Sequence, residues 1–211
     1  MCLTYCMKKH IAIVTFLSAA PMIFAADLKL ELLAPKEAFT IQKEHIAALK
    51  TLDQDQKDLQ VAMQDENADP KKIDELSAKI EKARAIQQGI DLTLRITNKG
   101  SKTTQLYYGA DTSRNVLTIE GEGAVFLAYR GMMTREYRTP EPTEIKAGES
   151  KDFVIKNLSF GVRDMDRWYI SQAGKYRATC QLIISNEENN QDETPPQLRT
   201  ETITFDVKLA E

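Results

Sequence analysis

The sequence has few of the residues on which enzyme chemistry usually depends. Histidine occurs only at His10 and His45 among 211 residues, and there are three cysteines. A Ser-His-Asp or Cys-His arrangement needs a histidine, and one histidine and one cysteine cannot supply the three or four nitrogen or sulfur ligands of a zinc site. His45 lies at the start of a predicted helix and Cys180 lies in a predicted strand. We therefore predict a non-enzymatic protein with no catalytic residues, no metal and no cofactor.

The sequence also has only one long apolar run, and it lies at the N-terminus. Lys8 and Lys9 precede Ile11–Phe24, a stretch of 14 uncharged residues that alanines follow. This is the layout of a secretory signal peptide, whereas a membrane span needs about 20 residues. We predict a signal peptide over residues 1–25, with an uncleaved anchor as the alternative. The mature protein is then expected in the periplasm or outside the cell, with no transmembrane segment after cleavage.

Signal cleavage would leave one cysteine. Cys2 and Cys6 precede the expected cleavage sites, which follow Ala25 or Ala26, so an intramolecular disulfide is excluded. Cys180 alternates with apolar neighbours, which places it on the buried face of a strand. We predict a buried thiol that packs like a small apolar side chain, and the alternative is a cysteine that bridges two chains.

A strong charge of one sign is lacking as well. The formal net charge is −3, and removal of Lys8 and Lys9 takes it to −5. The mature chain contains no block rich in Lys and Arg, which argues against nucleic acid as the main ligand. Its roughly 186 residues are enough for one domain with a proper core, or one domain and an appendage.

Short alternating segments dominate the rest of the chain. Apolar residues occur at every second position in 28–32, 90–96, 176–184 and 203–209, and turn signals such as Asn98–Ser101 separate such segments. This spacing is typical of half-buried strands. It predicts an antiparallel β-sandwich or barrel.

One segment differs from the rest in composition and in the spacing of its apolar residues. Gln42–Gln88 contains no glycine and one proline, and it is rich in helix formers. Its apolar residues follow three-four spacing, and Asp69 before Pro70 is typical of a helix start. We predict two antiparallel helices of about 18 residues each, with Gly89 as the C-terminal cap of the second.

This helical hairpin, residues 42–89, is predicted to interrupt a β-domain formed by residues 26–41 and 90–211. Such an insertion costs little because a hairpin brings its own ends together. The two helices are expected either to pack only on each other, or also to dock a second copy of the chain or another coiled coil. Because isolated short helices are marginal, part of the apolar side can also need the sandwich.

The stretch RDMDRWY is the most distinctive one outside the predicted core. It contains Arg163, Asp164, Asp166, Arg167 and Trp168, the only tryptophan. Paired carboxylates can act as acid and base when their pKa values differ, but adjacent arginines hold both ionised. We expect a charged loop that Trp168 pins to the sandwich. The alternative is a recognition surface, because Trp and Arg anchor interfaces.

A second candidate cluster, MMTREYR, contributes Met132, Met133, Tyr137 and Arg138. We expect it in a loop at the same partner-facing end of the domain. A third stretch, Asp65-x-Asn67-x-Asp69, has the spacing that opens an EF-hand loop but lacks the glycine and glutamate that such a loop requires. We interpret it as a polar turn between helices.

The predicted strands also carry a family resemblance. IDLTLRITNKGSK, IKAGESKDF and AGKYRATCQL resemble segments of the immunoglobulin-like domains of the bacterial intracellular proteinase inhibitor (BsuPI-like) family, and of a group of exported bacterial proteins. The resemblance covers about 90–209 and the first strand. It implies a mainly β, immunoglobulin-like antiparallel sandwich, here with an inserted α-helical hairpin. No inhibitory residue of the family matches a position in this sequence.

The expected function is an exported, non-enzymatic protein-binding or scaffolding module of the cell envelope. Its partner would be another protein, and the hairpin could also pair with a second copy of the chain. The alternative is a protease inhibitor acting outside the cytoplasm, which rests on the resemblance alone.

Overall fold

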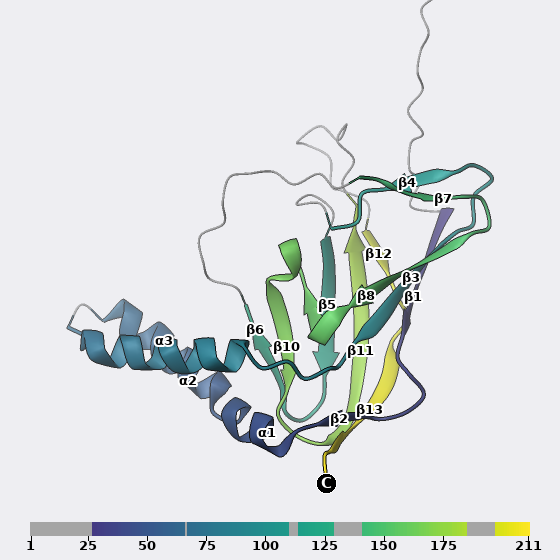
Figure 1. Ribbon diagram of the computed structural model, residues 1–211. Helices are drawn as coiled ribbons and strands as arrows, with labels where there is room; N and C mark the ends of the chain where they lie inside the picture. The colour runs from purple at the N-terminus through teal and green to yellow at the C-terminus, as the bar shows by residue number, and fades with distance from the viewer. Residues whose placement is uncertain (1–26, 66, 110–113, 129–140, 185–196) are drawn as a thin grey trace, which may run out of the picture.

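The computed structural model describes residues 27–65, 67–109, 114–128, 141–184 and 197–211. The predicted signal peptide lies outside them. Two β-sheets face each other, and a helical hairpin projects to one side of them (Figure 1).

The first sheet contains three antiparallel strands in the order β1–β3–β8. These are β1 (Leu28–Leu33), β3 (Leu92–Asn98) and β8 (Ser150–Ile155). Leu94 in the central strand lies opposite Leu32 on one side and Phe153 on the other. The alternation predicted for β1 and β3 is confirmed, because their even-numbered leucines and isoleucines face the interior.

The second sheet has the order β5–β11–β13–β2, and β12 extends it beside β11. Its strands are β2 (Phe39–Ile41), β5 (Arg114–Glu120), β11 (Gly174–Ile183), β12 (Gln197–Arg199) and β13 (Ile203–Leu209). β2 runs parallel to β13, and the other pairs are antiparallel.

This topology is immunoglobulin-like. β1, β3 and β8 take the places of strands A, B and E, and β5, β11 and β13 those of C, F and G. The hydroxyl of Tyr176 on β11 lies 2.9 Å from the carbonyl oxygen of Gln172, four residues upstream. This is the tyrosine corner of such sandwiches. The fold class predicted from the sequence is therefore confirmed.

The main core fills the space between the two sheets. Cys180 and Tyr176 are fully buried there beside Leu94, and Phe205 is 4% exposed. The prediction of a buried Cys180 is confirmed, and burial raises the pKa of its thiol to about 12. A thiol with such a pKa is neutral at pH 7, so it packs as a small apolar group.

The inserted segment lies between β2 and β3 and forms an antiparallel helical hairpin, as predicted. Its helices are α1 (Lys43–Leu49), α2 (Leu52–Gln64) and α3 (Pro70–Arg84). Only two residues separate α1 from α2, so these two helices form one arm of the hairpin. The Asp69 side chain accepts a hydrogen bond from the Lys71 amide, which confirms the predicted helix start.

The predicted end of the second helix was wrong. α3 ends at Arg84, and the C-cap is Ala85 rather than Gly89. Gly89 does adopt a left-handed conformation, with φ of 68°, but it lies five residues beyond the last residue of the helix. Residues 85–91 instead cross back to the sandwich, where Gln88 bonds to the Ile170 backbone and the Gly89 amide donates to the Asn157 side chain.

A small third sheet, in the order β6–β10–β9, lies between the hairpin and the sandwich. Its strands are β6 (Ala124–Leu127), β9 (Ser159–Phe160) and β10 (Asp166–Ile170). Two short turns, η2 (Lys156–Leu158) and η3 (Val162–Asp164), flank β9. A separate ribbon of β4 (Thr104–Leu106) and β7 (Thr143–Ile145) closes the far end of the molecule.

Candidate partner-binding surfaces

The RDMDRWY stretch is part of the third sheet rather than a loop. Asp166–Ile170 forms β10, so the predicted charged loop is confined to the turn before it. Trp168 does pin this segment to the sandwich, as predicted. Its Nε1 donates a hydrogen bond to the Leu117 carbonyl at 2.8 Å, and its ring lies 5.3 Å from that of Phe126. Both the indole nitrogen and the ring of Trp168 therefore already have partners within the protein.

Arg167 is also used internally. Its Nε donates to the Ser159 hydroxyl at 2.8 Å, and a terminal nitrogen donates to the Arg84 carbonyl at 3.3 Å. The guanidinium also lies 5.8 Å from the centre of the Tyr169 ring. A cation at the carbonyl end of α3 is stabilised by the helix dipole. Arg167 therefore positions the hairpin.

Arg163 and Asp164 form a tight left-handed turn, with φ values of 56° and 54°. Non-glycine residues rarely adopt this conformation, and such strain often occurs at functional sites. Desolvation raises the pKa of the Asp164 carboxyl, and the positive charge of Arg167 partly opposes that shift. Of the RDMDRWY candidates, Asp164 is the exposed one, and Asp166 begins β10 beside it.

The other predicted cluster cannot be placed. Met132, Met133, Tyr137 and Arg138 lie outside the described residues, so their predicted role stays a prediction. The adjoining residue that is described, Ala128, accepts a hydrogen bond from the Arg84 guanidinium at 2.7 Å.

The hairpin is joined to the sandwich by a second apolar cluster. Its buried members come from α1, α2, α3, β6 and β10: Leu49, Leu52, Ile80, Ala83, Leu127 and Tyr169. Of the interpretations that the sequence left open, the structure supports the one in which part of the apolar side needs the β-domain, and not the one in which the helices pack only on each other. Their apolar side is shared at the base with the third sheet, because two helices alone cannot enclose a core.

Gln88 adds a buried polar contact to this joint. Its side-chain amide accepts a hydrogen bond from the Ile170 amide at 2.8 Å and donates to the Ile170 carbonyl at 2.6 Å. Gln88 is 8% exposed. It pairs with β10 as a neighbouring strand would, and so it satisfies two backbone groups that burial would otherwise leave unpaired. Nothing in the residue pattern around Gln88 indicates this role.

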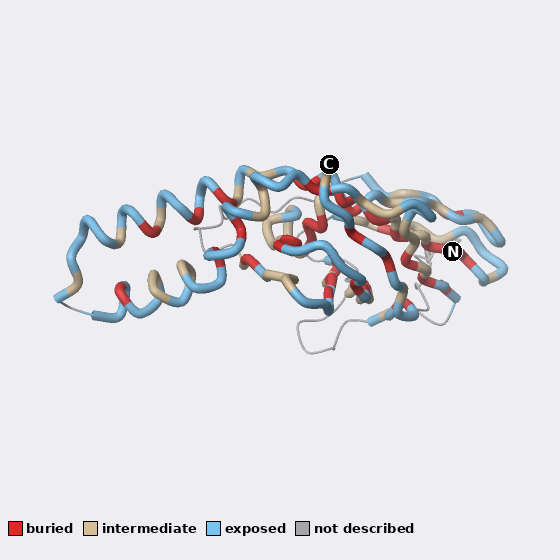
Figure 2. The backbone as a smooth tube through the Cα atoms, turned by 90° about the horizontal axis from the view of Figure 1, so that it is seen from below, coloured by how far each residue is buried: buried red, intermediate tan, exposed pale blue. Residues whose placement is uncertain are grey.

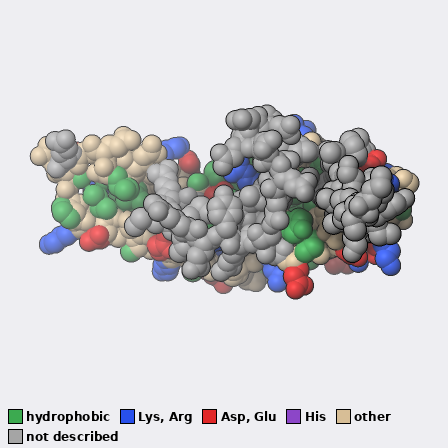
Figure 3. Space-filling model, turned by 90° about the horizontal axis from the view of Figure 1, so that it is seen from above, with side chains coloured by type: hydrophobic (Ala, Val, Ile, Leu, Met, Phe, Trp, Pro, Cys, Tyr) green, Lys and Arg blue, Asp and Glu red, His purple; other side chains and the backbone are tan. Residues whose placement is uncertain are grey.

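Most of the hairpin surface beyond this joint is exposed. Figure 2 shows buried residues along the facing sides of the two helices and exposed residues elsewhere. Val61 and Met63 in the last turns of α2 are 67% and 66% exposed, which is unusual for apolar side chains of this size. Figure 3 shows hydrophobic side chains gathered over the hairpin, seen from above.

A groove of about 350 Å³ lies at the tip of the hairpin, between the end of α2 and the start of α3. It is lined by apolar and charged residues: Asp58, Val61, Ala62, Asp65, Asn67, Ala68, Asp69 and Lys72. The Asp65 carboxylate accepts a hydrogen bond from the backbone amide of Asn67 at 2.9 Å, which agrees with the predicted polar turn. Within the described residues, no group of three metal-ligating side chains is suited to hold a metal ion.

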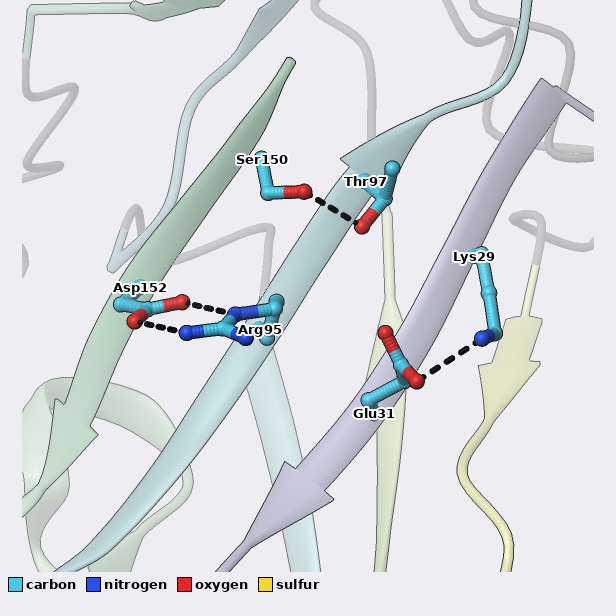
Figure 4. Close-up of polar contacts among 6 residues, drawn as sticks. All are labelled: Lys29, Glu31, Arg95, Thr97, Ser150 and Asp152. Carbon is cyan, nitrogen blue, oxygen red and sulfur yellow. Dashed lines mark hydrogen bonds and ion pairs between the residues drawn. The ribbon is translucent and has the colours of Figure 1, made fainter. Parts of the chain in front are cut away.

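The outer face of the first sheet carries charged residues that pair with one another (Figure 4). The Arg95 guanidinium makes two hydrogen bonds to the Asp152 carboxylate, at 2.7 and 2.8 Å, and Lys29 pairs with Glu31 at 2.8 Å. The two partners lower the pKa of both Asp152 and Glu31. This face therefore presents little uncompensated charge.

A second groove follows the open side of the sandwich, between β1 and the last strands. Its volume is about 550 Å³, and Lys99, Arg199 and Glu201 are among its charged lining residues. A further hollow of about 360 Å³ continues it along Ile203–Asp206, the part of β13 that β2 does not pair with. This side is a candidate for an extended peptide, because exposed strand edges accept added strands.

Two remaining side chains of interest lie apart. His45 is on α1 and Cys180 in the main core, so the structure does not bring them together. No helix in the described part of the chain combines the length and apolar character that crossing a bilayer requires.

No family model matches this chain, and no curated protein matches it. Two solved structures are similar over part of it. Native α2-macroglobulin from Escherichia coli, from domain MG7 to the C-terminus, is 15% identical over 57% of this chain and 14% of its own, with a TM-score of 0.29. The β-glucosidase EmGH1 from Erythrobacter marinus is 13% identical over 58% and 13%, with a TM-score of 0.26. Because both TM-scores are low, these likenesses carry no argument about function.

Proposed function

We propose that this chain is an exported, non-enzymatic protein-binding or scaffolding module of the cell envelope. The observation that carries the proposal is the hairpin, a firmly anchored arm that projects from a complete sandwich (Figure 1). The shared apolar cluster and the Gln88 contacts anchor its base, while Val61 and Met63 near its tip are exposed. Exposed apolar residues on a rigid support are typical of interaction sites.

The hairpin is a better candidate than the side groove. The open side between the first and last strands follows from the sandwich fold itself, whereas the hairpin is an addition to that fold. An addition that exposes apolar side chains lowers solubility unless a partner covers them. A binding role accounts for both its anchoring and its exposed end.

The proposal is tested with a shortened hairpin. Deletion of residues 60–73, with a short turn in their place, removes the tip and keeps the joint residues Leu49, Leu52, Ile80 and Ala83. Full-length and shortened chains are cross-linked in an envelope fraction, and the captured proteins are compared. We expect a partner that only the full-length chain captures.

Resistance of Cys180 to alkylation confirms that the shortened chain retains its sandwich. Capture of the same proteins by both chains would show that the hairpin is not the binding element. Inhibition of an exported protease at micromolar concentration by both chains would replace the proposal with the inhibitor alternative, which currently rests on the resemblance.

A further inference from the structure

The tip groove combines an apolar floor with an acidic rim. Val61, Ala62 and Ala68 supply the apolar part, and Val61 is 67% exposed. At about 350 Å³ the groove is near the small end of ligand-binding clefts, which span roughly 300–1,000 Å³. It is large enough for one or two side chains of a partner rather than for a large ligand.

The charge of the rim is negative and is not neutralised nearby. Asp58, Asp65 and Asp69 face one lysine, Lys72. Uncharged donors occupy one oxygen of each carboxylate: the Gln54 side chain for Asp58, and backbone amides for the other two. Among the described residues, none of the three carboxylates has an ion-pair partner within 4 Å. The groove therefore keeps a net negative charge of two.

We infer that the tip groove binds a lysine- or arginine-containing, partly apolar segment of a partner protein. A long basic side chain suits both features, because its methylene stem packs on apolar surface while its charged end reaches the carboxylates. A negative groove also attracts such a segment from a distance and repels acidic ones. This inference rests on the proposed function and identifies the part of the hairpin that carries it.

The inference is tested on the full-length protein with two matched synthetic peptides. One is an amphipathic helix of leucine and lysine, and the other has glutamate in place of every lysine. We expect only the lysine peptide to bind, with NMR shifts concentrated at Val61 and Ala62. Binding should weaken between 50 and 300 mM salt, because charge attraction is screened.

Matched variants distinguish binding at the groove from attraction to the negative charge of the protein as a whole. Asp58→Asn and Val61→Thr should each weaken binding of the lysine peptide by about three- to tenfold, since each removes one contact without changing shape. The controls are Asp53→Asn, which makes the same charge change on α2 away from the groove, and Val154→Thr on β8. Both controls should bind within about twofold of the original protein.

Three results would overturn the inference. The lysine peptide fails to bind, the glutamate peptide binds equally well, or Asp53→Asn weakens binding as much as Asp58→Asn. Concentration-dependent dimers in sedimentation that Asp58→Asn abolishes would instead identify a second copy as the occupant. If peptide binding fails while capture of an envelope partner still requires the hairpin, the proposed function stands and the groove is not its site.

Discussion

The sandwich encloses its core between two sheets, whereas the hairpin has only two helical arms and completes its core with the third sheet. The main cluster draws residues from both sheets, and members such as Leu94 and Cys180 are fully buried. The hairpin cluster has six buried residues, two of which, Leu127 and Tyr169, belong to strands. Its distal turns contain exposed Val61 and Met63. The hairpin therefore depends on the sandwich for order at its base.

The sandwich therefore supplies the stability of the fold, while the hairpin tip keeps an exposed surface for a partner. Elements with few buried contacts open at lower free energy than the core of a domain does. A hairpin anchored at one end can keep an unpaired surface at the other without endangering the sandwich. The following predictions test whether the two regions are as separate as this comparison implies.

The largest effect is expected from Leu94→Ala in the centre of β3. Leu94 is fully buried between β1 and β8, so its truncation removes apolar contacts and leaves a cavity. We expect the free energy of unfolding to fall by about 3–5 kcal/mol in urea titrations. Cys180 should become correspondingly easier to alkylate. A loss below about 1 kcal/mol would show that this core tolerates a cavity at its centre.

Gln88→Ala should weaken the joint alone. It leaves the buried amide and carbonyl of Ile170 without their partners, at a cost of about 2–3 kcal/mol. Amide exchange should accelerate in α3 and β10, while Cys180 remains protected from alkylation. Gln87→Ala, a change at the exposed neighbour, is the control and should have little effect. Equal exposure of Cys180 in Gln88→Ala and Leu94→Ala would show that hairpin and sandwich unfold as one unit.

Tyr176→Phe probes the tyrosine corner. The hydroxyl lies within hydrogen-bonding distance of the Gln172 and Glu122 carbonyl oxygens, and the ring is fully buried. The variant keeps the ring and loses the hydrogen bond, so we expect a loss of about 1 kcal/mol. The loss should appear in the unfolding of the sandwich and not in the exchange of α3. The reverse pattern would contradict the assignment of Tyr176 to the sandwich.

The smallest effect is expected from Asp152→Asn on the outer sheet face. Arg95 lowers the pKa of Asp152 in the folded protein, so the pair stabilises the fold above the ordinary carboxyl pKa, and this contribution is lost as pH falls through the lowered value. Because both groups are exposed, we expect the Tm to fall by under about 2 °C at pH 7. The difference from the original protein should vanish in acid. A difference that persists at pH 2 would show that the variant acts through packing.

The regular parts of the fold were predictable from residue pattern. β1 and β11 alternate in burial because one face of each packs on the core, and β3 does so as far as Ile96. Asp69–Pro70 marks the start of α3 through local chemistry. These signals need no knowledge of distant residues. The end of α3 was misplaced because Gly89 resembles a helix cap, although the chain has already left the helix at Ala85.

The candidate site was harder to predict because it depends on contacts between distant segments. Trp168 and Arg167 looked like interface anchors, but both bind atoms inside the protein, at Leu117 and Arg84. A polar residue such as Gln88 gives no sign in sequence that it will pair with a strand more than eighty residues away. The tip groove exists only once α2 and α3 are side by side.

The hairpin leaves from β2, in one sheet of the sandwich, and returns to β3, in the other. A pull on its tip is therefore divided between two layers that pack on each other through the main core. Such a load would shear the layers past each other instead of unzipping a single ladder, which distributes the resistance over many contacts at once. A load applied through this arm would therefore be carried by both layers of the sandwich.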